Sequence, residues 1–350
     1  MSFRRIDESP AGLLPLNRPP MPPLASLETA MTRPDTRPDV LVGDWLARTL
    51  PLTAEGGEEV VATLVHRDGM PRSRRAVLYV HGYCDYFFQT HLAERWEALG
   101  FDVYALDLRR YGRSLRPWQI PNFCTDLAVY DEELDAAVAI LRQELGYDRL
   151  VVMAHSTGGL VTALWADRRR GRGQIDAMVM NSPWFDLAGG WLLRGPVTAA
   201  IEVVGALSPT LVVSSLGPHY GRSIHRSGTG EWDYDLTWKP IDGFPVRAGW
   251  FRAIRRGHAA LAAGLAIDAP VLVCCSTASG PNNRWHDAIT RTDSVLDVAQ
   301  IVARAPCLGP MVTVERIADG IHDLSLSAEP ARSRFFDTIA DWIGGRLPPN

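Results

Sequence analysis

The stretch LVVMAHSTGG, residues 150–159, runs from five apolar residues through one serine, Ser156, into two glycines. The apolar run predicts a buried strand, and the helical spacing of apolar residues that continues to residue 168 predicts a helix directly after it. A serine at so tight a turn needs small residues two positions away on each side, and Ala154 and Gly158 provide them. The N-terminus of the helix would face Ser156 and favour negative charge there. The stretch therefore predicts a nucleophilic serine at the carboxyl end of a strand.

Short apolar runs alternate with amphipathic segments on both sides of this stretch. The expected buried strands are 76–80, 102–106, 150–154, 177–180, 270–274 and 311–314, and the expected helices are 90–99, 124–145, 158–168, 298–305 and 331–343. Continuous apolar runs are typical of parallel strands that are covered on both faces. With an antiparallel hairpin at 44–52 and 59–65, the pattern predicts an α/β protein with a mostly parallel eight-stranded sheet and helices on both faces.

One interval interrupts this alternation. Residues 184–268 contain no clean strand, yet they carry five of the eleven tryptophans, namely Trp184, Trp191, Trp232, Trp238 and Trp250. We expect a helical cap here, inserted between the sixth and seventh strands, that either roofs a pocket with apolar side chains or forms a small satellite core. Residues 39–183 and 269–350 would then form the core domain, and the proline-rich residues 1–38 an N-terminal arm.

A serine nucleophile needs a base, and the best candidate is His322 in the sequence DGIHDLSLS. It follows the last expected strand, so its side chain can reach over the carboxyl edge of the sheet. Four other histidines are weaker candidates because they lie before or beside the turn elements or next to the penultimate strand: His81, His155, His258 and His286.

The acid that orients this base should lie between the serine and the histidine in the chain. The long loop after residues 270–274 offers Asp287, Asp293 and Asp297. Asp297 directly precedes a helix and suits an N-cap, whereas Asp293 lies in the loop itself and is free to accept the second N–H of the histidine. We expect Asp293 to be the acid, and we expect Asp323, the neighbour of His322, to point to the surface because adjacent side chains diverge.

Two backbone N–H groups should stabilise the oxyanion. One belongs to Thr157, the residue after the serine, and the other to the loop after the strand at residues 76–80. In that loop His81 and Gly82 end the strand and place the Tyr83 amide as the second donor, with Gly82 permitting the turn. A simple tight turn would fit His81 and Gly82 equally well.

Composition excludes several classes of partner. The chain has 36 basic and 40 acidic residues, a net charge of −4, so no concentrated basic face is available for nucleic acid. Its five cysteines match neither a zinc spacing nor a disulfide framework, so we expect no metal and no cofactor. Prolines interrupt any N-terminal apolar signal, and no apolar run is long enough for a membrane span, which favours a cytoplasmic protein. The oligomeric state stays open.

Five motifs carry a family resemblance: YVHGY, ALDLRRYGRS, AHSTGG, RTDSVLDV and GIHDLSLS. They resemble the α/β-hydrolase superfamily, and within it the serine aminopeptidase and monoacylglycerol lipase-like branch, over residues 76–342. The resemblance implies a cap between the sixth and seventh strands and strengthens Asp293 as the acid. Arg109, Arg110 and Tyr111 depart from the family pattern, as does the length of the acid loop.

The resemblance implies a serine hydrolase that forms an acyl-enzyme and acts on a small-molecule acyl substrate. An aromatic cap favours carboxylic esters of lipophilic alcohols or glycerol. An aminopeptidase is the alternative, and it would need an acidic anchor for the free amino terminus, for which Glu202, Glu231, Asp233 and Asp235 are candidates. A non-hydrolytic member that binds a ligand in the capped pocket is the third possibility.

Overall fold

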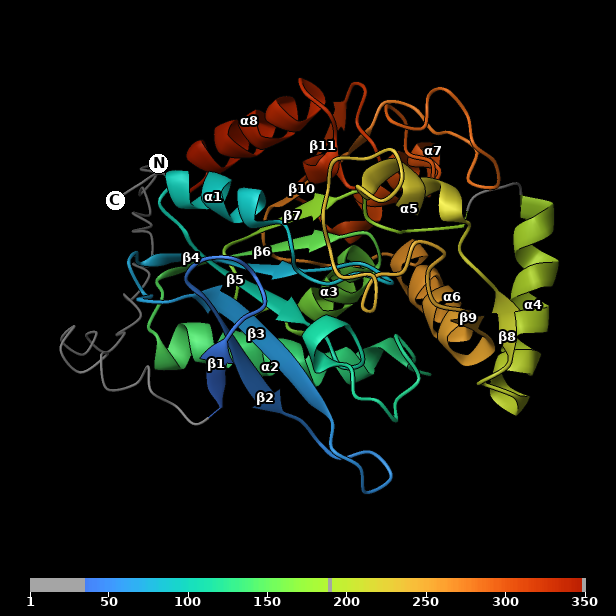
Figure 1. Cartoon of the computed structure of the whole chain (residues 1–350), viewed down its shortest axis with the longest axis horizontal. Helices are drawn as coiled ribbons and strands as arrows, with labels where there is room; N and C mark the ends of the chain where they lie inside the picture. The colour runs from blue at the N-terminus through green and yellow to red at the C-terminus, as the bar shows by residue number, and fades with distance from the viewer. Residues whose placement is uncertain (1–34, 188–190, 348–350) are drawn as a thin grey trace, which may run out of the picture. The chain divides into compact units, whose positions relative to one another are not determined.

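Nine strands form the central sheet of the protein, whose structure is a computed structural model that describes residues 35–187 and 191–347. The strand order is β1-β2-β3-β5-β4-β6-β7-β10-β11 (Figure 1). The strands span β1 Thr36–Pro38, β2 Trp45–Pro51, β3 Val61–Arg67, β4 Arg75–Val80, β5 Asp102–Asp107, β6 Arg149–His155, β7 Ala177–Asn181, β10 Val271–Ser276 and β11 Val312–Ile317. From β5 to β11 all neighbours in the sheet are parallel, and β1, β2 and β3 add an antiparallel edge.

The eight expected strands are present, and the ninth, β1, was not expected. The sequence places Thr36–Pro38 in the proline-rich arm, but these residues pair with β2 at the edge of the sheet. An edge strand tolerates proline because the missing N–H would not have bonded inside the sheet. The remainder of the expected arm, residues 1–34, lies outside the described residues.

Two layers of helices cover the sheet, and alternation along the strands explains why. In β4, Val77 and Tyr79 belong to the core under α1 (Thr90–Ala98) and α8 (Ala331–Gly344). Ala76, Leu78 and Val80 belong to the core on the other face, together with residues of α2 (Asp131–Ala139), α3 (Thr157–Arg168) and α7 (Val298–Arg304). Successive side chains of a strand point to opposite faces, so a wholly apolar strand feeds both cores.

The structure contains short 3-10 and π-helical turns that the periodicity does not indicate. The single helix expected over 124–145 is a 3-10 turn at Leu127–Tyr130, then α2, then a π-helical turn at Ile140–Glu144. Further 3-10 turns lie at Gly112–Ser114, Ala305–Leu308 and Leu324–Leu326. Short turns of this kind frequently flank α-helices and leave no periodic pattern of their own.

The insertion between β7 and β10 contains α4 (Trp191–Leu207), α5 (Pro218–Ile224) and α6 (Ala248–Ala262). It also contains a two-stranded antiparallel sheet of β8 (Val212–Ser214) and β9 (Val246–Arg247), too short to show in the sequence pattern. Figure 1 shows α6 between α3 and α4, so that α4 lies on the far side of α6 from the core. None of the helices within the described ranges combines the length and the apolar character that crossing a bilayer would require.

Candidate active site

Ser156 lies at the sharp turn between β6 and α3. Its backbone has φ 52° and ψ −120°, a strained conformation for a residue with a side chain. The turn depends on Gly158, because a β-carbon there would lie 2.3 Å from the carbonyl oxygen of His81. The amide of Ser156 donates to the carbonyl oxygen of Asn181 at 3.0 Å, which ties the turn to the end of β7.

A chain of hydrogen bonds connects Ser156 to His322 and Asp293. His322 Nε2 lies 3.0 Å from Ser156 Oγ, and His322 Nδ1 lies 3.0 Å from Asp293 Oδ2. All three side chains are buried. The other carboxylate oxygen of Asp293 accepts from the amides of Val295 at 2.9 Å and Leu296 at 2.7 Å, which fixes the carboxylate in its loop. The structure therefore brings together the three side chains that the sequence suggests for nucleophile, base and acid.

The competing residues are engaged elsewhere. Asp297 caps α7 by accepting from the amide of Ala299 at 3.0 Å, as its sequence position indicates, and Asp287 is exposed. The four other candidate histidines have the following partners: Leu108 N for His81, Asn181 O for His155, Trp184 O for His258 and Ser294 Oγ for His286. None of the hydrogen bonds within the described part of the chain joins these histidines to Ser156.

The prediction for Asp323 is wrong, because this carboxylate is fully buried. Its side chain has different hydrogen-bond partners from that of His322, but it points into the protein, toward Gln89 and Asn181, and not to the surface. Asp323 is the N-cap of the 3-10 turn Leu324–Leu326 and accepts from the Ser325 amide at 3.0 Å. The D-x-S spacing of residues 323–325 could have indicated the capping role, since aspartate commonly caps the start of a helical turn, but it does not indicate burial.

The two residues that the sequence suggests as oxyanion donors, Thr157 and Tyr83, belong to segments that adjoin Ser156. Thr157 is the first residue of α3, so its amide has no partner within the helix. The loop that carries Tyr83 approaches the serine closely, because a β-carbon on Gly82 would lie 2.9 Å from the β-carbon of Ser156. Gly82 therefore permits the close approach of this loop to Ser156, which a side chain at position 82 would obstruct.

A buried ion pair joins the insertion to the loop between β4 and α1, which also carries Gly82 and Tyr83. Lys239, the only lysine of the chain, donates from Nζ to Asp85 Oδ1 at 2.5 Å, and both side chains are largely buried. Burial acts to lower the pKa of Lys239, but the charge of Asp85 and the hydrogen bond to it outweigh burial and raise the pKa. The ammonium also lies 5.1 Å from the centre of the Phe88 ring. No pattern in the sequence indicates a role for Lys239.

Aromatic side chains from the insertion and the core meet beside Ser156. The ring of Trp250 lies 4.0 Å from that of Tyr83 and 5.9 Å from that of Trp184, measured between centroids. The amide of Trp184 donates to the carbonyl oxygen of Ser156 at 3.0 Å. Two other tryptophans of the insertion pack against core loops instead: Trp232 Nε1 donates to the Leu326 carbonyl oxygen, and the Trp238 ring meets that of Tyr86 edge-on.

His258 supports Trp184 and should make stability depend on pH. Its Nδ1 accepts from Arg255 and its Nε2 lies 3.1 Å from the Trp184 carbonyl oxygen, which requires the neutral ring. Burial, and then the charge of Arg255, lower the pKa of His258 from 6.5 to about 3. Between pH 6.5 and about pH 3, His258 is therefore protonated in the unfolded chain but neutral in the folded chain. The free energy of unfolding is highest above pH 6.5 and decreases as the pH falls below that value.

From pH 7 to pH 5 this histidine alone should lower the free energy of unfolding by about 2 kcal/mol. The measurement is urea unfolding of the wild type and of His258→Gln at both pH values. The glutamine cannot ionise, so its loss of stability over this interval should be smaller than that of the wild type. Equal losses in the two proteins would contradict the assignment.

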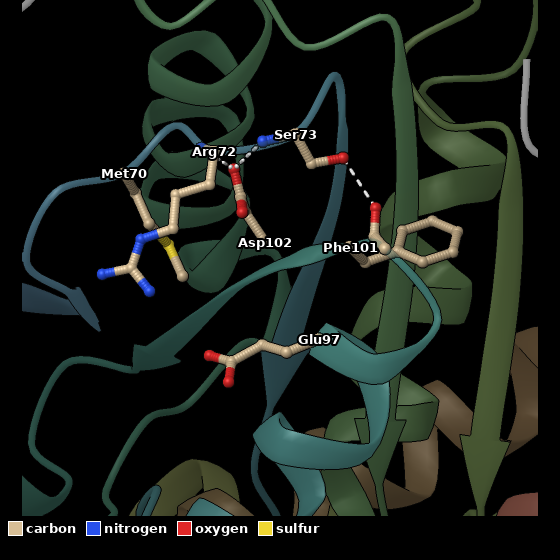
Figure 2. A pocket seen from close by; sticks show the side chains of 7 residues that line it. Met70, Arg72, Ser73, Glu97, Phe101 and Asp102 are labelled. Atoms are coloured by element: carbon tan, nitrogen blue, oxygen red, sulfur yellow. Dashed lines mark hydrogen bonds between the residues drawn. The ribbon is translucent and has the colours of Figure 1, made fainter.

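The described residues hold no group of three or more histidine, cysteine or acidic side chains able to bind a metal ion. A cavity of about 190 Å³ is lined by Met70, Arg72, Ser73, Glu97, Gly100, Phe101 and Asp102. Figure 2 shows the side chains that line it. The cavity lies where β4 and β5 begin, whereas Ser156 lies where β6 ends. The cavity and Ser156 are therefore at opposite ends of the parallel strands. Asp102 Oδ2 accepts from the amides of Arg72 and Ser73 and from the Tyr147 hydroxyl. Its carboxylate is thus occupied by the protein itself.

A mostly parallel sheet between two helical layers, with a serine at a strained turn after a central strand, defines an α/β-hydrolase fold. The family model for serine aminopeptidases, S33, matches residues 71–279, more than half of the chain. The protein belongs to this family. The matched region contains Tyr83, Ser156 and Thr157 and ends before Asp293 and His322.

Curated proteins of similar sequence match over shorter stretches. The monoacylglycerol lipase of Mycolicibacterium smegmatis is 31% identical over 169 residues, which cover 46% of this chain and 55% of that protein. Epoxide hydrolase 1 of Caenorhabditis elegans is 29% identical over 92 residues, 26% of this chain and 21% of that protein. The match thus spans about half of the lipase and about a fifth of the epoxide hydrolase.

Solved structures confirm the fold over most of the chain. A soluble variant of monoglyceride lipase from Saccharomyces cerevisiae, in complex with a substrate analogue, superposes with a TM-score of 0.62 at 15% identity. It covers 86% of this chain and 96% of its own. A carboxyl esterase from Bacillus coagulans in complex with glycerol gives 0.58 at 12% identity, with 86% and 98% covered. At these identities the likeness concerns the fold alone.

Proposed function

We propose that the protein is a serine hydrolase that cleaves carboxylic esters of lipophilic alcohols or glycerol through an acyl-enzyme. The observation that carries the proposal is the hydrogen-bonded chain from Ser156 Oγ through His322 to Asp293, with 3.0 Å at each step. Distances in this range allow a base to take the proton of a hydroxyl and an acid to orient that base.

The reaction begins when His322 Nε2 takes the proton of Ser156 Oγ as the oxygen attacks the ester carbonyl carbon. Asp293 holds the Nδ1–H tautomer and stabilises the imidazolium that forms. The amides of Tyr83 and Thr157 donate to the oxyanion. The alcohol leaves with the proton from His322, and a water molecule, activated by the same histidine, then hydrolyses the acyl-enzyme to the free acid.

The aminopeptidase alternative is less well supported because the candidate acidic anchors already have partners. Glu202 pairs with Arg252 and Arg256, and Glu231 pairs with Arg332. Asp233 pairs with Arg226, and Asp235 accepts from the backbone and hydroxyl of Thr237. An anchor for a free amino terminus would need an available carboxylate close to the nucleophile.

The insertion, residues 184–268, acts in this proposal as a cap on a core formed by residues 39–183 and 269–350. Trp184 and Trp250 support this role, because their rings gather with Tyr83 beside the serine and its oxyanion loop. Apolar aromatic walls favour the hydrocarbon part of an ester. The similarity to a mycobacterial monoacylglycerol lipase points in the same direction.

The test compares p-nitrophenyl esters of graded acyl length with an aminoacyl p-nitroanilide, following release of the chromophore. We expect turnover of esters with an optimum chain length and little turnover of the anilide. Preference for the anilide would favour the aminopeptidase. A protein that neither turns over these substrates nor reacts with a fluorophosphonate, which labels an activated serine, would be a non-hydrolytic member of the family.

A further inference from the structure

One buried residue, Asn181 at the end of β7, contacts both the serine turn and the histidine loop. Its carbonyl oxygen accepts from the amide of Ser156 at 3.0 Å. Its side chain donates from Nδ2 to Asp323 Oδ1 at 2.7 Å and accepts from the amide of Leu324 at 3.1 Å. Asp323 and Leu324 directly follow His322, so Asn181 bridges the two segments that carry the proposed nucleophile and base.

The Asp323 carboxylate is the centre of this bridge. Besides the Asn181 amide it accepts from the Ser325 amide at 3.0 Å, the Ser325 hydroxyl at 2.7 Å and Gln89 Nε2 at 3.1 Å. Burial acts to raise the pKa of Asp323, but its neighbours, His155 first and then the Ser325 hydroxyl, outweigh burial and lower the pKa to about 2. A carboxylate without exposed surface is therefore ionised at neutral pH, held by donors from three segments.

The backbone beside the imidazole is held from the insertion as well. The Asp323 amide donates to the hydroxyl of Tyr220 at 3.0 Å, and the Tyr220 ring meets the His322 ring edge-on at 5.8 Å. Two hydrogen bonds thus join the segment after His322 to Asn181 of β7, one through the Asp323 carboxylate and one through the Leu324 amide. A third joins the Asp323 amide to Tyr220 of α5.

We propose that Asp323 and Asn181 are positioning residues that hold the main chain of His322 so that its Nε2 stays within hydrogen-bond distance of Ser156 Oγ. The proposal rests on the proposed function. Neither side chain touches the reacting atoms, and each acts through the backbone that carries them. A displacement of about 1 Å in such a pair can cost about a hundredfold in rate, so loss of the bridge should affect the chemical step.

The test is Asp323→Asn, which keeps the size of the side chain but turns one acceptor oxygen into a donor. That donor would face an N–H of Asn181, Ser325 or Gln89, so the cluster cannot stay fully bonded. Asp102→Asn is the matched control, because Asp102 is another buried carboxylate that accepts from two backbone amides and a hydroxyl, and it lies at the opposite end of the parallel strands. Figure 2 shows Asp102 with Arg72 and Ser73, whose amides donate to it. Both variants should lower the melting temperature.

Only Asp323→Asn should slow ester turnover, with kcat lower by about 10- to 100-fold and KM within about 3-fold of the wild type. Asn181→Ala should resemble it, and the double variant should be no slower than the slower single one, since the two residues act as a unit. If Asp323→Asn fails to fold, Gln89→Leu removes one donor from the same carboxylate and should give a smaller loss of kcat.

The rate of labelling by a fluorophosphonate separates this proposal from the ester function, because it reports the activation of Ser156 without a natural substrate. Slower labelling of Asp323→Asn than of Asp102→Asn would support the positioning role even if wild type hydrolyses no ester tested. Equal labelling rates and equal kcat in the two variants would overturn it. A wild type that is not labelled would overturn both proposals.

Discussion

Replacing Ser156 by alanine is expected to lower ester turnover by about 10⁵-fold or more, the loss typical of removing a catalytic serine. The reason is that Ser156 Oγ lies 3.0 Å from His322 Nε2, so the hydroxyl can give its proton to this base, and none of the other hydroxyls in the described residues forms a hydrogen bond with that nitrogen. The melting temperature should stay close to that of the wild type, since a single oxygen is removed. The measurement is steady-state release of p-nitrophenol together with fluorophosphonate labelling, which should disappear.

Ser182 offers a matched control for this variant. It also follows a central strand, β7, is fully buried and has a positive φ of 45°. Its hydroxyl has no hydrogen-bond partner in the described part of the protein. Ser182→Ala should retain turnover within about 3-fold of the wild type. Turnover that survives in Ser156→Ala and falls in Ser182→Ala would refute the assignment of the nucleophile.

The second large effect is expected for Asp293→Asn, with kcat lower by about 10³- to 10⁴-fold. The asparagine can present its NH₂ group to His322 Nδ1, which then accepts, and the proton moves to Nε2, the wrong nitrogen for a base. The oxygen that accepts from Val295 and Leu296 is retained, so the loop should keep its conformation. The measurement is kcat on the best p-nitrophenyl ester, with circular dichroism to verify folding.

Asp297→Asn controls for changes to the same loop. Asp297 caps α7 and contacts neither His322 nor Ser156 in the described structure, so its replacement should cost at most about 1 kcal/mol of stability and leave kcat unchanged. A greater loss of kcat in Asp297→Asn than in Asp293→Asn would transfer the role of the acid to Asp297.

Much of the fold follows from local patterns. The buried strands and the closing helix could be predicted because continuous apolar runs and 3.6-residue periodicity are properties of single segments. Asp293 and Asp297 could be told apart for a similar reason, since a helix cap is recognised from the residues directly after it. The strand β1 could not, because an edge strand of three residues has no buried pattern of its own.

The remaining features depend on segments that are far apart in the chain. Asp323 contacts Gln89 and Asn181, and Lys239 contacts Asp85 across 154 positions. Nothing near Asp323 in the sequence shows that its charge will be met by these donors. The divergence of adjacent side chains predicts that Asp323 and His322 point different ways. It does not predict which of the two points toward the core.

The buried pair between Lys239 and Asp85 has a practical consequence for chemical labelling. The chain has a single ε-amino group, and in the folded protein this amine is protonated, largely buried and bonded to a carboxylate. Amine-directed reagents require a free, uncharged amine, so Lys239 should become acylated only when the insertion separates from the loop that carries Asp85. The extent of acylation of Lys239, measured by mass spectrometry, would therefore report how often the insertion separates from the loop that carries Asp85.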